Sequence, residues 1–139
     1  MPRGVHVLTT IHCLGAIACL VMGVGSAVSN EFRLGLIASP GSALMMDVFG
    51  QHVWIFLFAI ASLLLTLCYG SWQLRPWALP LTVVCYSIGV AGGLWETTVG
   101  VPAGFLAAAI NATVVAYACT KQVRLAYGWP ARKNVATLL

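Results

Sequence analysis

The sequence predicts an all-α membrane protein, a bundle of four transmembrane helices with both termini in the cytoplasm. Hydrophobic residues make up 60% of the 139 residues and charged residues 7%, whereas a soluble domain carries about 25% charged residues. The apolar residues fall in four long runs, and a helix needs roughly 20 such residues to cross a bilayer. The runs lack the apolar-polar alternation of membrane barrel strands. We therefore expect helices, which satisfy their own backbone hydrogen bonds in lipid.

The four expected helices cover residues 5–28, 48–69, 77–95 and 103–127, with an outer loop over 29–46. Only short connections remain, so the chain is interpreted as a single integral membrane domain. The turn between the second and third helices carries Trp72, Arg75 and Trp77, which are residue types typical of the headgroup layer. Tyr127 and Trp129 suit the same layer, so the fourth helix is expected to continue to residue 127.

The basic residues indicate the orientation. One of the seven Lys and Arg residues, Arg33, falls in the outer loop. The other six lie in the N-terminus, the second connection and the C-terminal tail, namely Arg3, Arg75, Lys121, Arg124, Arg132 and Lys133. Such an excess marks the cytoplasmic side of a membrane protein. Its positive charge attracts anionic lipid and does not indicate nucleic acid binding.

Small residues at four-residue intervals mark faces where membrane helices approach closely, because helix association in lipid depends on packing and hydrogen bonds. Such rows occur on the first, third and fourth expected helices. The expected helix-packing residues are Gly15, Gly23, Gly89, Gly93, Ala108 and Ala112. They serve packing inside the bundle or, alternatively, contact with another subunit.

Polar side chains within the membrane are the first place to look for function. The candidates are His12, His52, Glu96 and Asn111. At 1.5 Å per residue, His12 and His52 differ in depth by about 14 Å, so one haem iron cannot bind both. His52 and Glu96 both lie near the outer surface, and His12 and Asn111 differ in depth by about 7 Å. Each of these two pairs is therefore a candidate hydrogen bond, and His12 and His52 are the candidate cofactor ligands.

The sequence contains no recognisable catalytic pattern. Paired intramembrane carboxylates, metal-binding spacings, a nucleophile elbow and a phosphate-binding loop are all lacking, although an enzyme normally needs positioned acids, bases or metals. No catalytic residue, metal site or resident cofactor is predicted, and enzymatic activity is not expected.

Two segments carry a resemblance to a known class of protein. Residues 4–8 (GVHVL) open a Gly-rich first helix, and residues 69–78 (YGSWQLRPWA) form the turn into the third. Together they resemble the small, uncharacterised four-helix integral membrane proteins of bacteria. The resemblance implies a bacterial cytoplasmic membrane and no particular activity.

Three functions remain open at this stage. The favoured one is a non-catalytic accessory or assembly subunit that packs against a larger respiratory or photosynthetic membrane complex, with lipids and other subunits as partners. The second is a small oligomeric channel or transporter whose path is lined by the four polar residues. The third is a redox protein in which His12 or His52 binds a haem or chlorophyll-type pigment shared with a partner subunit.

Overall fold

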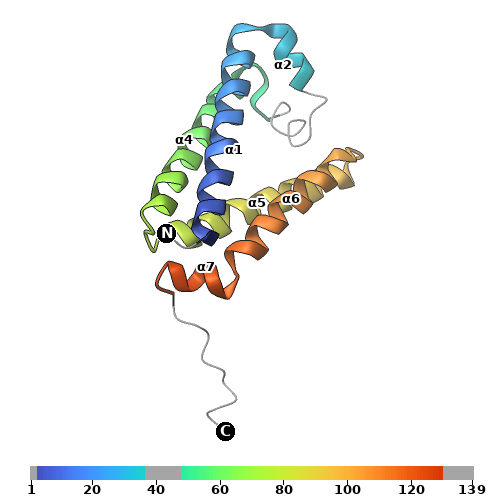
Figure 1. The fold of residues 1–139 in the computed structure, drawn as a ribbon. Helices are drawn as coiled ribbons and strands as arrows, with labels where there is room; N and C mark the ends of the chain where they lie inside the picture. The colour runs from blue at the N-terminus through green and yellow to red at the C-terminus, as the bar shows by residue number, and fades with distance from the viewer. Residues whose placement is uncertain (1–2, 37–47, 130–139) are drawn as a thin grey trace.

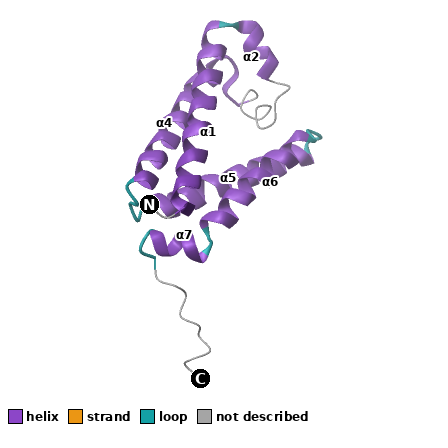
Figure 2. Cartoon of the chain, in the orientation of Figure 1, coloured by secondary structure: helices purple, strands orange, loops and turns teal. Residues whose placement is uncertain are grey.

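The computed structural model describes residues 3–36 and 48–129, and every regular element in these two ranges is helical (Figures 1 and 2). The elements are α1 (Arg3–Val28), α2 (Asn30–Leu36), the short 3-10 helix η1 (Gly50–His52), α4 (Val53–Trp72), α5 (Ala78–Thr98), α6 (Ala103–Ala118) and α7 (Lys121–Ala126). The all-helical prediction is confirmed. The outer loop expected over 29–46 contains α2, and its remainder from residue 37 onward lies outside the described residues.

Three of the described helices are long and apolar enough to cross a membrane: Val5–Val28, Gly50–Trp72 and Ala78–Thr98. The fourth, α6, has 16 residues and is therefore about 24 Å long at 1.5 Å per residue. The hydrocarbon core of a bilayer is about 30 Å thick. The fourth predicted span, α6, is thus shorter than the thickness of the hydrocarbon core.

The long helices form two pairs. Helix α1 packs along α4, and α5 packs along α6, while contacts between the pairs are few. Figure 1 shows the pairs meeting at the end that holds the N-terminus and α7, and diverging from there. The long helices thus pack mainly as two pairs, because the close-packing face of each helix contacts a single partner.

The fourth predicted helix is broken. Residues 103–127 were expected to be continuous, but α6 ends at Ala118 and Thr120 adopts an extended conformation (φ −62°, ψ 149°) before α7 begins. The break turns α7 back under the helix pairs, where Val123 and Tyr127 become buried. A straight helix would carry both side chains away from the molecule, so their burial favours the break.

Three helix ends share one cap, the Schellman motif, in which the residue after the C-cap is left-handed. Leu74, Gly100 and Gly128 hold this position, with φ of 55°, 89° and 73°. After α5, for example, the Gly100 amide donates a hydrogen bond to the Thr97 carbonyl oxygen, and the Val101 amide donates one to the Glu96 carbonyl oxygen. In the sequence a proline follows two residues after each of the three, which fits because proline cannot continue a helix.

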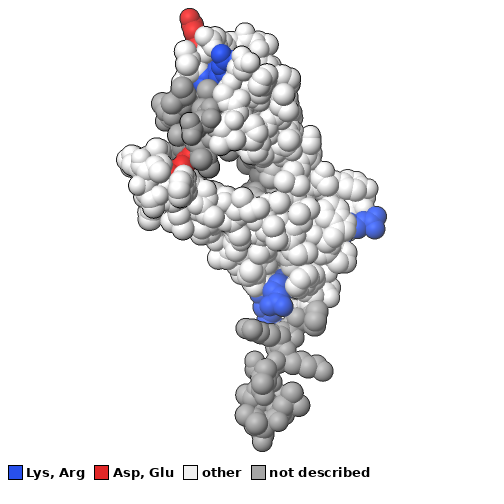
Figure 3. Space-filling model, turned by 180° about the vertical axis from the view of Figure 1, so that it is seen from behind, with Lys and Arg blue, Asp and Glu red and all other residues white. Residues whose placement is uncertain are grey.

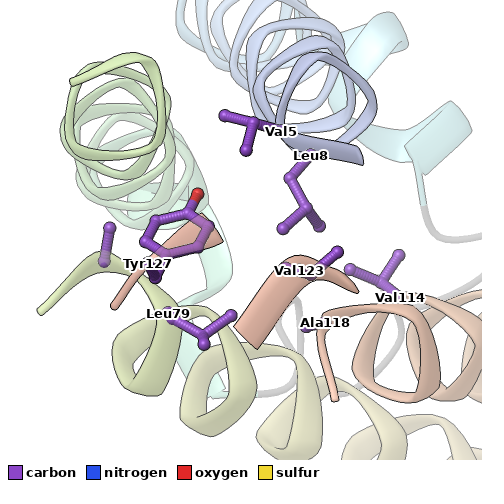
Figure 4. Packing of buried hydrophobic residues seen from close by; sticks show 8 residues of the cluster. Val5, Leu8, Leu79, Val114, Ala118, Val123 and Tyr127 are labelled. Atoms are coloured by element: carbon purple, nitrogen blue, oxygen red, sulfur yellow. The ribbon is translucent and has the colours of Figure 1, made fainter. Parts of the chain in front are cut away.

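The main apolar core lies where the two pairs meet. It comprises Val5, Leu8, Ala78, Leu79, Val114, Ala118, Val123 and Tyr127. Figure 4 shows these side chains converging from α1, α5, α6 and α7, with the Tyr127 ring beside Leu79 and its hydroxyl pointing away from it. Segments far apart in the sequence are thus joined at this end of the molecule, which we call the junction.

Candidate functional site

The largest fully buried polar side chain among the described residues is that of His12, at the junction. The His12 side chain has no exposed surface, and neither do Ser71 near the end of α4 and Thr82 near the start of α5. His12 Nδ1 lies 3.4 Å from Ser71 Oγ, and His12 Nε2 lies 3.4 Å from Thr82 Oγ1. One α1 side chain therefore contacts the helices of both pairs.

The hydrogen bond made by Thr82 determines the tautomer of His12. Thr82 Oγ1 donates its hydrogen to the Ala78 carbonyl oxygen at 2.8 Å. It has one hydrogen only, so it accepts from His12 Nε2–H. Burial disfavours the charged form of the ring, and a neutral ring then accepts from the Ser71 hydroxyl at Nδ1. Both contacts are longer than the usual 2.7–3.2 Å, so each bond is weak.

Two tyrosines complete the surroundings of this cluster. The Tyr86 ring packs against the imidazole, with ring centroids 5.7 Å apart and planes inclined at 41°. Tyr127 is buried on the side of Ser71, and its hydroxyl has no hydrogen-bond partner within the described ranges. Burial raises the pKa of Tyr127.

The predicted pairing of His12 with Asn111 is wrong. Asn111 Nδ2 donates to the Ala107 carbonyl oxygen of its own helix at 2.8 Å. Its amide group lies directly over Gly89 of α5, where an added Cβ would approach it to 2.8 Å. The two residues match in depth, but α6 packs on α5 while α1 packs on α4, which separates them laterally.

His52 and Glu96 lie on different helix pairs. His52 is exposed at the start of α4, and its Nε2 lies 3.3 Å from the amide nitrogen of its neighbour Gln51. Glu96 is only 2% exposed and lies in the α5–α6 contact, against Gly104. The two predicted neighbours therefore lie in different environments, an exposed imidazole and a buried carboxyl group.

The small residues of α1 and α5 lie against neighbouring helices. A Cβ at Gly15 or at Gly23 would lie 3.2 Å from Leu64 or Phe58 of α4, respectively. A Cβ at Gly93 would lie 2.6 Å from the carbonyl oxygen of Gly104.

The two predicted packing residues of α6 differ in burial. Ala108 is 4% exposed and packs on α5, whereas Ala112, expected at the same contact, is exposed. Gly104, which the row did not include, is the residue that meets Gly93. It lies four residues before Ala108, so the four-residue interval itself was a usable signal.

Ser71 and Thr82 are the site residues that sequence reasoning missed. The sequence places Ser71 in the expected turn and Thr82 within the third helix, and neither is ionisable. The usable signal is that both hydroxyls lie near the same end of the bundle as His12. Within residues 3–36 and 48–129, no group of three or more His, Cys, Asp or Glu side chains is placed to hold a metal ion.

The arrangement connects helices, because the His12 imidazole on α1 contacts hydroxyl groups of both α4 and α5. Comparison with protein-family models, curated proteins and solved structures gives no match to this chain. Its function is therefore inferred from its own residues.

Proposed function

We propose that this protein is a non-catalytic accessory or assembly subunit that packs against a larger membrane complex, of the respiratory or photosynthetic kind. We place it in a bacterial cytoplasmic membrane with both termini on the cytoplasmic side, as the distribution of basic residues favours. The observation that carries the proposal is a row of small residues left uncovered on α6.

This row consists of Ala109, Ala112 and Ala116, all of them exposed. Their spacing of three and four residues places them along one side of the helix. The neighbouring side of α6, with Gly104 and Ala108, already packs on α5. Small residues on a membrane helix allow a second backbone to approach closely, so the uncovered row is suited to a helix from another protein.

The length of α6 supports the same proposal. A hydrophobic helix shorter than the bilayer core is accommodated by local thinning of the bilayer or by association with other helices. At about 24 Å, α6 falls short of the core by several ångströms, and a partner helix alongside it would relieve the mismatch.

The two alternatives have less support. For a haem or pigment protein, His12 offers no free nitrogen, since Ser71 and Thr82 occupy both. For a channel or transporter, the polar residues would have to line one path. His12 is buried at the junction, Asn111 bonds its own helix, and His52 is exposed on the other pair.

The test is native purification in a mild detergent, comparing Ala112→Trp with Ile110→Trp. Both positions are exposed on α6, and they lie on different sides of the helix because two residues correspond to about 200° of rotation. We expect the native chain to co-migrate with a larger assembly, Ala112→Trp to release it, and Ile110→Trp to remain bound. The helical content of each variant, compared with that of the native chain, shows whether it folds.

Other outcomes would replace the proposal. The transport function takes its place if the native chain migrates alone and moves an ion or solute when reconstituted in liposomes. In that case Glu96→Gln or His52→Ala should abolish the transport. If the purified chain shows a haem or chlorophyll absorption band that His12→Ala or His52→Ala removes, the cofactor-binding function does.

A further inference from the structure

An open groove runs along the outside of the junction, between α5, the end of α6 and α7. Its volume is ≈ 270 Å³, and its lining includes Leu79, Val83, Val84, Ala118, Arg124 and Trp129. From these residues we infer that the groove binds an anionic phospholipid, with the lipid phosphate on Arg124 and part of an acyl chain along α5.

The break between α6 and α7 creates this site. Because Thr120 is extended, α7 turns back and places Arg124 beside the start of α5. The cap that ends α7 then brings Trp129 over the same place, with its backbone amide 2.9 Å from the Arg124 carbonyl oxygen. Tryptophan prefers the headgroup layer of a membrane, so the groove starts at that level and extends toward the hydrocarbon.

The charge at this end of the molecule favours the binding of an anion. Of the carboxyl groups in the described parts of the chain, Glu31 lies on α2 and Glu96 in the last turns of α5. Glu96 is 16 residues beyond Pro80 of the groove, about 24 Å along the helix. In Figure 3 red appears in the upper part of the view, and the blue side chain toward the lower end of the molecule has no red side chain beside it. Arg124 is therefore far from both of these carboxyl groups, and a basic residue near the surface attracts anionic lipid.

The remaining lining argues for a lipid over a soluble anion. Apart from Arg124, the groove presents apolar side chains, which a free phosphate ion would leave uncovered. A small-molecule site is usually larger, about 300–1,000 Å³, and has several polar groups that orient the ligand. One cation beside an apolar track matches a phosphate joined to a hydrocarbon chain.

The test titrates the full-length protein, purified in mild detergent, with phosphatidylglycerol or phosphatidylcholine, and counts bound lipid by native mass spectrometry. We expect preference for phosphatidylglycerol, and Arg124→Gln to weaken its binding by about fivefold, the ratio for one basic residue near a membrane surface. Val84→Trp, which fills the exposed edge of the groove, should weaken the binding of both lipids. Lys121→Gln is the matched control, because it removes an equal charge from α7 at an exposed position outside the groove.

The inference fails if the native chain does not distinguish the two lipids, or if Arg124→Gln and Lys121→Gln weaken binding equally. It also fails if Val84→Trp leaves lipid binding unchanged, or if inorganic phosphate alone displaces the bound phosphatidylglycerol. Arg124→Lys keeps the charge and should retain most of the preference, which separates loss of charge from loss of structure.

Discussion

His12 and Thr82 are joined by a hydrogen bond whose direction is determined, because Thr82 gives its only hydrogen to the Ala78 carbonyl oxygen and must accept from the imidazole. This contact connects α1 to α5, which belong to different helix pairs. On the other side of the ring, Ser71 connects it to α4. Contacts between the pairs are few, and this buried imidazole adds a polar connection to the apolar core at the junction.

The first prediction concerns this connection. His12→Ala should lower the free energy of unfolding by about 2–4 kcal/mol, since it leaves a cavity and removes two buried hydrogen bonds. The control is His6→Ala on the same helix, where the side chain is exposed and little change is expected. Denaturation of the detergent-solubilised protein, followed by its helical signal, measures both. Equal stability of the two variants would contradict a structural role for His12.

The second prediction compares two adjacent glycines of α5. Gly93→Ala should destabilise the α5–α6 pair by about 1–3 kcal/mol, because its Cβ would lie 2.6 Å from the Gly104 carbonyl oxygen and 2.7 Å from the Ala108 nitrogen. Gly92→Ala meets no atom within 4 Å and should be neutral or stabilising by up to about 1 kcal/mol through its higher helix propensity. Thermal midpoints of the two variants test this. Identical midpoints would mean that α5 and α6 do not pack through Gly93.

The third prediction concerns Tyr127, whose pKa is raised by burial. A phenol that resists ionisation in the folded state contributes stability that is fully present below the ordinary tyrosine pKa of about 10. This contribution is lost as the pH rises through the higher folded-state pKa, because the unfolded chain ionises first. The native protein should therefore lose stability above about pH 10, and Tyr127→Phe should lose less.

The same substitution has a second expected effect at neutral pH. The Tyr127 hydroxyl is buried without a hydrogen-bond partner in the described part of the chain, so removing it should be neutral or stabilising by up to about 1 kcal/mol. Tyr69→Phe is the control, since Tyr69 is exposed and accepts a 2.7 Å hydrogen bond from Gln73. Thermal midpoints between pH 7 and 11 measure both effects. A steeper alkaline loss in Tyr127→Phe than in the native chain would refute the assignment.

The fourth prediction is the orientation. Cysteines introduced at Glu31 and at Gln73, both exposed, should differ in their reaction with a membrane-impermeant thiol reagent added to intact cells. The positive-inside rule predicts labelling at residue 31 and protection at residue 73. The experiment needs Cys119→Ser as background, because Cys119 is the exposed native cysteine among the described residues. Labelling of residue 73 from outside would reverse the proposed orientation.

The sequence by itself determined the properties that depend on local chemistry. Continuous apolar runs require helices in lipid, and the structure is helical throughout its described ranges. Local sequence also indicates where two helices end, because Pro76 and Pro102 follow two residues after the left-handed Leu74 and Gly100. The depth of a residue could be estimated for the same reason, because the rise per residue of a helix is constant.

Tertiary structure alone decided which helices became neighbours. His12 and Asn111 have similar depth, yet the first contacts Ser71 and Thr82 and the second bonds its own helix. The apolar run ends before Lys121 and Gln122, but no local signal requires the chain to turn at Thr120, because the gain comes from burying Val123 and Tyr127 against distant residues. Lateral packing and side-chain burial are sums over contacts between remote segments, and no local pattern in the chain contains them.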